Sequence, residues 1–187
     1  MNQEKMAQGI RTFLEALDQR FDGDELERTP ERVARAWAED LVVGYAENPE
    51  AVLTWSAAPR DAGPVVVREM RFASVCAHHL LPFFGRAAIV YLPGERLAGL
   101  SKLGRVVDAL SRRLQTQEHL TSAIATTLTR ALAPRGVAVR LEAEHTCMTL
   151  RGVRKEQSRM VTLAATGVYD ADVHARSEAL ALLVGGA

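Results

Sequence analysis

The sequence has no long apolar run, no net charge and only two cysteines. With 23 basic and 23 acidic side chains among 187 residues, it is poorly suited to blanket electrostatic binding of nucleic acid. Because it has neither a run of about 20 apolar residues nor a basic and then apolar N-terminus, we expect no membrane contact and a cytoplasmic location. There is no internal repeat. The length and the 48% of hydrophobic residues indicate one globular domain with an appended segment.

The charge is unevenly distributed along the chain. Residues 1–60 hold 7 basic and 12 acidic side chains, whereas residues 61–187 hold 16 and 11, so the two parts carry −5 and +5. The basic part could hold a small polyanion locally.

Both cysteines lie close to histidines. Cys76 is followed two positions later by the pair His78-His79, and Cys147 comes two positions after His145. Thiolate and imidazole are good zinc ligands, and Cys76, His79 and Cys147 would leave the fourth tetrahedral position open, as in a catalytic site. His78 and His145 are then candidates for proton transfer near neutral pH, although either could instead complete a closed structural site. A disulfide between the cysteines is the alternative to a metal.

A phosphate site is expected where a turn meets a helix after Gly99. Free backbone N–H groups and the helix dipole favour anions there, and Ser101, Lys102 and Arg105 add donors. Three more arginines could join this grip: Arg32, Arg151 and Arg154. The alternative is a solvated basic helix face.

Gln117-Glu118 opens the next predicted helix. An acid in a first turn is expected merely to complement the helix dipole. As a pair, however, an amide and a carboxylate suit the edge of guanine, since the carboxylate can accept from N1–H and the 2-amino group.

Hydrophobic periodicity predicts the order helix, helix, strand, strand, helix, helix, strand, strand. The expected elements are helices over 1–20, ended by Asp22-Gly23-Asp24, and from Thr29 to Tyr45, strands over 65–75 and 85–92, helices over 103–114 and 120–131, strands over 137–147 and 159–169, and a short helix or tail over 170–183. The alternation over 137–147 places His145 and Cys147 on one face of a strand. This order indicates an α+β domain with helices on one face of a largely antiparallel sheet. We expect a helical extension and linker over 1–63, a catalytic domain over 64–170 and a helix or tail over 171–187.

Four stretches together resemble GTP cyclohydrolase I, in register from Thr29 to Tyr169. They are Cys-Ala-His-His-Leu-Leu-Pro-Phe at 76–83, Gly-Leu-Ser-Lys-Leu-Gly-Arg-Val-Val at 99–107, Ser-Arg-Arg-Leu-Gln-Thr-Gln-Glu-His-Leu-Thr at 111–121 and His-Thr-Cys-Met-Thr-Leu-Arg-Gly-Val at 145–153. The resemblance implies a tunnelling-fold subunit, an antiparallel sheet with two helices packed on one face, preceded by an N-terminal helical extension. It also implies a toroidal homodecamer with active sites between subunits and GTP as the substrate.

The resemblance further implies a reaction in which water activated by Zn2+ adds to C8 of guanine, formate is released, and 7,8-dihydroneopterin triphosphate is formed for folate and pterin biosynthesis. It matches Cys76, His79 and Cys147 to the zinc ligands and His78 and His145 to proton transfer. It matches Gln117 and Glu118 to guanine, Ser101, Lys102, Arg105 and Arg151 to the sugar and triphosphate, and Arg32 to the triphosphate at a neighbouring subunit.

Two departures from the family pattern open alternatives. Ala77 stands where the family usually has glutamate, and residues 160–165 are more apolar than the expected threonine-rich run. A divergent paralogue could therefore stop at an opened-ring intermediate or use a related purine nucleotide. Two further alternatives are another tunnelling-fold enzyme, such as the nitrile reductase of deazaguanine synthesis, and a non-catalytic zinc protein with a structural or regulatory role. The reductase would need a cysteine nucleophile, whereas both cysteines here suit a metal.

Overall fold

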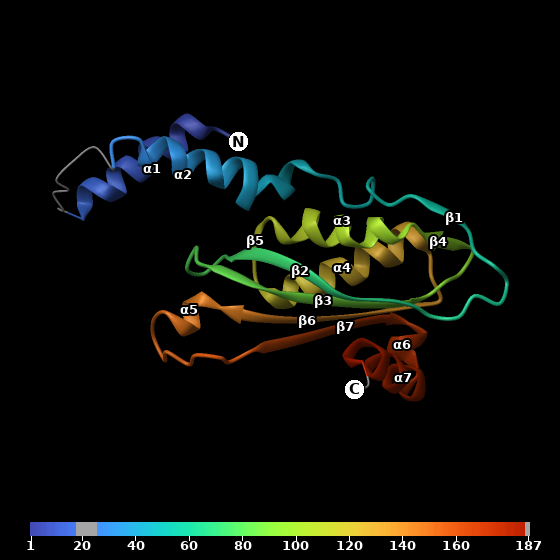
Figure 1. The fold of residues 1–187 in the computed structure, drawn as a ribbon. Helices are drawn as coiled ribbons and strands as arrows, with labels where there is room; N and C mark the ends of the chain where they lie inside the picture. The colour runs from blue at the N-terminus through green and yellow to red at the C-terminus, as the bar shows by residue number, and fades with distance from the viewer. Residues whose placement is uncertain (18–25, 186–187) are drawn as a thin grey trace. The chain divides into compact units, whose positions relative to one another are not determined.

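The computed structural model describes residues 1–17 and 26–185 and divides the chain into two compact units, Met1–Val43 and Gly44–Ala187 (Figure 1). The boundary between the units falls inside the stretch 1–63 that was expected to hold the extension and linker. The predicted helix end at Asp22-Gly23-Asp24 lies outside the described residues.

The first unit is a pair of helices, as predicted. Helix α1 (Gln3–Ala16) begins where the Asn2 side chain accepts a hydrogen bond from the backbone N–H of Lys5. Helix α2 (Thr29–Ala36) has a proline in its first turn and continues into the π-helical turn η1 (Trp37–Leu41). An ion pair of 2.6 Å between Arg11 and Glu31 joins α1 to α2.

The second unit is built on a five-stranded sheet with the order β5-β2-β3-β6-β7. Its long strands are antiparallel: β2 (Val65–Cys76), β3 (Pro82–Leu92), β6 (Gly136–His145) and β7 (Met160–Gly167). The two-residue strand β5 (Leu114–Gln115) runs parallel to the end of β2. Between the first unit and the sheet come the 3-10 turn η2 (Val43–Ala46) and β1 (Trp55–Ala57), which pairs with β4 (Arg96–Ala98). The three short strands were not predicted.

Helices α3 (Leu100–Ser111) and α4 (Gln117–Leu132) cover one face of this sheet (Figure 1). Their apolar stripes, which include Leu103, Ile124 and Leu128, are fully buried against inward-facing residues of β6 such as Val139 and Leu141. The apolar face given by the alternation along β6 and the apolar stripes given by the 3.6-residue period of the helices therefore face each other. This arrangement confirms the predicted α+β class.

The opposite face of the sheet is partly covered by the C-terminal segment. Strand β7 ends at Gly167, whose φ of +62° suits glycine, and not at Tyr169 as predicted. Tyr169 lies in the short helix α6 (Val168–Ala171), and α7 (Val173–Val184) follows. Leu183 of α7 packs in a second core cluster with Val90 and Ala138, so the segment expected as a helix or tail is a packed helix.

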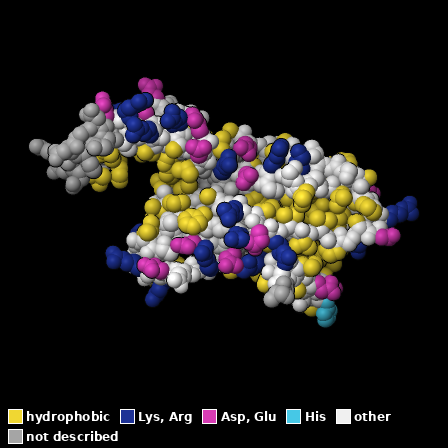
Figure 2. Space-filling view, viewed as in Figure 1, with side chains coloured by type: hydrophobic (Ala, Val, Ile, Leu, Met, Phe, Trp, Pro, Cys, Tyr) yellow, Lys and Arg dark blue, Asp and Glu magenta, His cyan; other side chains and the backbone are white. Residues whose placement is uncertain are grey.

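The rest of this face carries ion pairs beside exposed apolar side chains of β7. Arg86 pairs with Glu69, Arg140 with Glu142, and Arg159 with Glu144, and Figure 2 shows side chains of both signs mixed over the strands. No helix within residues 1–17 and 26–185 combines the length and apolarity that a membrane span requires.

Candidate functional site

The turn from β2 to β3 holds the first cysteine and two histidines. Cys76 is the last residue of β2 and is 6% exposed. Its carbonyl accepts from Leu80 N at 2.9 Å and its N–H donates to Leu81 O at 2.9 Å, which closes the turn tightly. The turn brings Cys76 Sγ to 3.8 Å from Nδ1 of His79.

The second cysteine reaches this turn differently from what the alternation predicted. Strand β6 ends at His145, and Cys147 lies in the one-turn helix α5 (Thr146–Thr149), so the expectation that both side chains continue one strand face is wrong. The Thr146 hydroxyl donates to the Pro82 carbonyl at 2.6 Å, and Leu150 N donates to Thr146 O at 2.9 Å. These bonds turn the backbone out of the strand at Thr146 and anchor α5 beside the start of β3.

Cys76, His79 and Cys147 form a cluster that could hold a metal ion. Their potential ligand atoms all lie within 4.8 Å of one another, and both cysteines are free thiols, so the alternative of a disulfide is not seen. Burial, together with the nearby Cys76, raises the pKa of the Cys147 thiol, while Arg151 opposes that effect. A bound cation would reverse this balance, because it stabilises thiolates.

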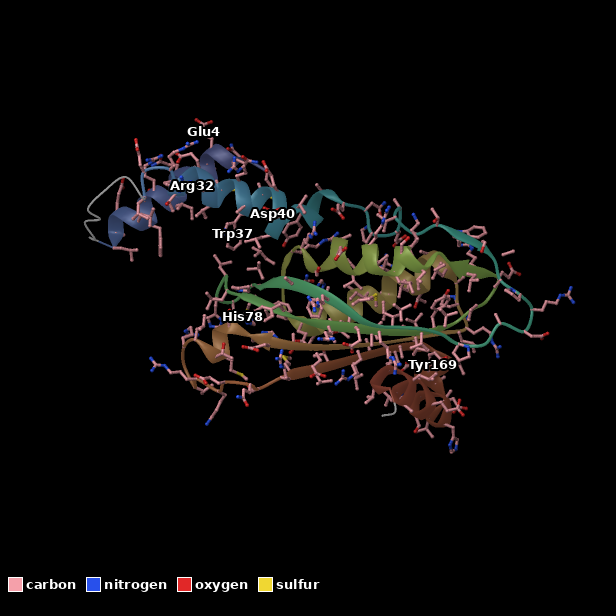
Figure 3. All side chains as sticks on the ribbon, viewed as in Figure 1. Glu4, Arg32, Trp37, Asp40, His78 and Tyr169 are labelled. Carbon is pink, nitrogen blue, oxygen red and sulfur yellow. The ribbon has the colours of Figure 1, made fainter. Side chains whose placement is uncertain are left out.

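His145 is the better-fixed of the two histidines assigned to proton transfer. Its ring stacks on Phe83 with centroids 4.5 Å apart and an angle of 4°, and its Nε2 lies 2.8 Å from Oε1 of Gln117. Burial lowers its pKa, and the Glu118 carboxylate opposes the shift. His78, by contrast, is exposed at the left end of the sheet in Figure 3, with its ring edge-to-face with His79 at 6.1 Å.

The two residues that were expected to face guanine differ in exposure. Glu118 is exposed at the start of α4. Gln117 is 0% exposed, and its amide bonds within the chain to β6, β7 and His145. A guanine edge cannot reach that amide without displacing these bonds.

The phosphate-binding candidates are also divided. Arg151 lies close enough to Cys147 to influence its pKa. Ser101, Lys102 and Arg105 lie on the first turns of α3. This helix begins beside β4, at the end of the sheet opposite the turn that holds Cys76 and His79 (Figure 1). Ala98 N, just before α3, donates to the Tyr91 hydroxyl at 3.0 Å. Tyr91 and Phe83 are eight residues apart on β3, which corresponds to roughly 26 Å.

Arg32 lies in the first unit, on α2, and is exposed. Arg154 lies in the loop after α5, where it is exposed.

Within one chain, the candidate metal cluster, His145, Glu118 and Arg151 lie together. The α3 residues Ser101, Lys102 and Arg105 lie apart from them.

Two neighbours of the proposed catalytic residues were not predicted from the sequence. Phe83 pairs directly with His145 in the β3–β6 register, and Thr162 of β7 bonds to the Gln117 amide at 3.0 Å. The threonines of β7 could have indicated which face of this strand packs on α4. Thr162 and Thr166 lie on that face, where they bond to Thr121 and Thr129. The apolar Val161 and Leu163, on either side of Thr162, are exposed on the other face.

Comparison with known proteins places these residues in a family. The family model described as GTP cyclohydrolase I matches residues 6–184. The chain is 44% identical to GTP cyclohydrolase 1 of Streptococcus agalactiae over 186 residues, covering 99% of each protein. It is 43% identical to that of Pelotomaculum thermopropionicum, covering 100% of this chain and 99% of the relative, and 42% identical to that of Deinococcus radiodurans, covering 94% and 81%.

Among solved structures, archaeosine synthase QueF-Like in the apo form aligns with 58% of this chain and 97% of its own. The two are 17% identical, and the TM-score is 0.49.

Proposed function

Because the chain belongs to the GTP cyclohydrolase I family, it is a GTP cyclohydrolase, and we propose that it opens the guanine imidazole ring at C8 with a zinc ion held by Cys76, His79 and Cys147. Formate and 7,8-dihydroneopterin triphosphate, for folate and pterin biosynthesis, are the proposed products. The observation that carries the proposal is the cluster of two thiols and one imidazole beside the buried His145–Gln117 pair.

The donor set fits zinc. Zinc–sulfur and zinc–nitrogen bonds of about 2.3 and 2.05 Å at a tetrahedral angle separate the two ligand atoms by about 3.6 Å. Cys76 Sγ and His79 Nδ1 are 3.8 Å apart. When bound, zinc supplies the Lewis acidity that makes water nucleophilic at neutral pH.

The chain's own residues supply binding and proton transfer. The Glu118 carboxylate is suited to accept from N1–H and the 2-amino group of guanine, because it is exposed and lies close enough to His145 to affect its pKa. His145 and His78 exchange protons with the ring nitrogens as bonds at C8 form and break. Arg151 holds phosphate oxygens.

We propose that the remaining phosphate contacts come from neighbouring copies, with Ser101, Lys102 and Arg105 provided by one copy and Arg32 by another. The distance along β3 between the α3 end and the metal end of the sheet supports this. So do the sheet edges: β7 is an edge strand whose Val161 and Leu163 are 47% and 54% exposed, and β2 pairs with β5 only at its last two residues. For a homodecamer, light scattering should give a molar mass ten times the 20.4 kDa of the chain.

Incubation of zinc-loaded protein with GTP tests the activity. Release of formate, with a pterin product of the expected mass, supports the proposal, and intact GTP in the presence of fully loaded protein would overturn it. A product mass that retains the formyl group would instead identify the divergent paralogue that Ala77 raises as an alternative. Unchanged GTP would also leave the non-catalytic zinc protein as the remaining alternative.

Substitution of the two unligated histidines separates an open from a closed metal site. For His78→Ala and His145→Ala we expect the zinc content of the parent with loss of turnover. Loss of zinc in either variant would indicate that the histidine is a fourth ligand. The free thiols also suit a reducing compartment, and we propose a cytoplasmic location.

A further inference from the structure

The buried amide of Gln117 is the most completely bonded side chain around the proposed catalytic residues. Its Nε2 lies 3.0 Å from Met160 O, 3.3 Å from Leu141 O and 3.0 Å from Thr162 Oγ1, and its Oε1 lies 2.8 Å from His145 Nε2. A glutamine buried to 0% exposure at a ligand site is not expected to be free to read a substrate.

The partners of this amide determine which way it faces. Backbone carbonyls only accept hydrogen bonds, so the NH2 group must face Met160 and Leu141. The flipped amide would place its oxygen against two carbonyl oxygens and leave the NH2 group facing His145. Oε1 therefore faces His145.

The hydroxyls beside the amide point to the same orientation. Thr121 Oγ1 donates its one hydrogen to Gln117 O at 2.7 Å, so in its 2.6 Å contact with Thr162 it must accept. Thr162 then donates to Thr121, and its oxygen is left to accept from Gln117 Nε2. The chain of donors runs from His145 through Gln117 and Thr162 to Thr121.

Because an amide oxygen only accepts, His145 must donate through Nε2. We infer that Gln117 is a positioning residue that holds His145 in the Nε2–H tautomer, with Phe83 fixing the plane of the ring, so that Nδ1 is the nitrogen that exchanges protons with the substrate. Phe83 is 0% exposed and stacks at 4°, so the ring has one allowed plane and one anchored edge. Within the part of the chain that the structure describes, no residue hydrogen-bonds to Nδ1.

This role differs from guanine recognition, and the two predict different kinetics. If Gln117 bound guanine, Gln117→Met would raise KM for GTP. If Gln117 positions His145, the same substitution would lower kcat and leave KM and zinc content unchanged, since the ring would sample both tautomers and tilt on Phe83. The fall in kcat should be at least about 10-fold and should not exceed the roughly 10²- to 10⁴-fold that general acid–base catalysis contributes.

The tautomer is tested directly by 15N NMR of the zinc-loaded parent chain labelled at histidine, with the His145 signal assigned by its absence in His145→Gln. We expect a protonated Nε2 and an unprotonated Nδ1 at His145, with loss of that pattern in Gln117→Met. A protonated Nδ1 in the parent would overturn the inference, and this measurement stands even if the variant fails to fold.

Thr129→Val provides the matched control. Thr129 also joins α4 to β7, through a 2.7 Å bond to Thr166, but it has no contact with His145. It should keep the parent kcat, and equal losses in Thr129→Val and Gln117→Met would reduce Gln117 to a structural tie. The inference rests on the proton-transfer role proposed for His145, so formate release by the parent is measured in parallel. Failure of that activity would sink the proposed function, while the NMR result would still decide the tautomer.

Discussion

Thr146 fixes the position of Cys147, a proposed metal ligand, through a hydrogen bond. It is the residue at which β6 becomes α5, and its hydroxyl is bonded to the Pro82 carbonyl at 2.6 Å. The bond fastens the helical turn that carries Cys147 to the strand that leaves the Cys76 turn. Two segments 60 residues and more apart in sequence are thus joined one residue away from the metal cluster.

For Thr146→Val we expect weaker zinc binding in a chain that still folds. The hydrogen bond that this variant removes is worth about 1 kcal/mol, or roughly 5-fold in zinc affinity if it acts only on the bound geometry. Competition with a chromophoric chelator measures the affinity. Thr149→Val, in the same short helix, has the same change of side chain without such a bond in the described part of the chain and should bind zinc as the parent does. Equal affinities in the two variants would contradict this role for Thr146.

Tyr169 gives the stability of the chain a dependence on alkaline pH. Burial, with Glu178 nearby, raises the pKa of its hydroxyl above the usual value of about 10. The folded chain therefore keeps this proton at pH values where the unfolded chain loses it. The resulting stability is complete below about pH 10 and is lost as the pH rises through the folded-state pKa.

Tyr169→Phe should remove this part of the pH dependence. Urea unfolding at pH 7 is expected to change little, because no hydrogen bond of the hydroxyl is found within residues 1–17 and 26–185. Between pH 9 and 11 the free energy of unfolding should fall less in the variant than in the parent. An equally steep fall in both would show that Tyr169 does not retain its proton in the folded state.

At the scale of elements, the sequence predicted the helices and strands whose apolar residues recur at a regular period. Strand β6 was recognisable because Val137, Val139, Leu141 and Ala143 alternate, and the same residues are buried against α3 and α4. Three features have no period to detect: the strands β1, β4 and β5 are only two or three residues long. The helical turn at Cys147 is set by a hydrogen bond to Pro82, which lies far away in sequence.

The features of the candidate site also divide into those that the sequence predicted and those that it did not. Residue type and spacing were enough to identify the cluster of Cys76, His79 and Cys147 as a candidate metal site, since few side chains suit a soft or borderline cation. The interactions of Gln117 were not identifiable. They depend on which residues β6 and β7 place opposite the start of α4, and this is a tertiary contact that local sequence does not encode.

Helix α7 is a structural element with a testable contribution. Leu183 is 2% exposed in the cluster with Val90 and Ala138, whereas its neighbour Leu182 is 38% exposed. Leu183→Ala should lower the free energy of unfolding by about 2–5 kcal/mol, and Leu182→Ala by clearly less. Urea midpoints with unchanged m-values measure the difference. Similar midpoints for the two variants would mean that α7 is not docked on the sheet in solution.

At the scale of the molecule, we propose that one chain holds two halves of a site, neither of them complete by itself. The metal cluster, His145 and Glu118 lie at one end of the sheet, while Ser101, Lys102 and Arg105 lie on the first turns of α3 near the other. A half that binds the triphosphate and a half that performs the chemistry can form one site if copies associate through the open edges of β2 and β7.

Mixing two inactive variants tests this directly. Cys147→Ser removes a proposed metal ligand, and the double variant Lys102→Ala, Arg105→Ala removes two proposed phosphate contacts, so each variant should be nearly inactive alone. If every site takes one half from each of two copies, random co-assembly of equal amounts leaves about a quarter of the sites with both halves intact. Co-expression should then restore formate release toward that fraction, whereas separately purified variants mixed without subunit exchange should not. Sites contained within single chains would leave the co-expressed mixture as inactive as its parts, because each chain carries one of the two defects.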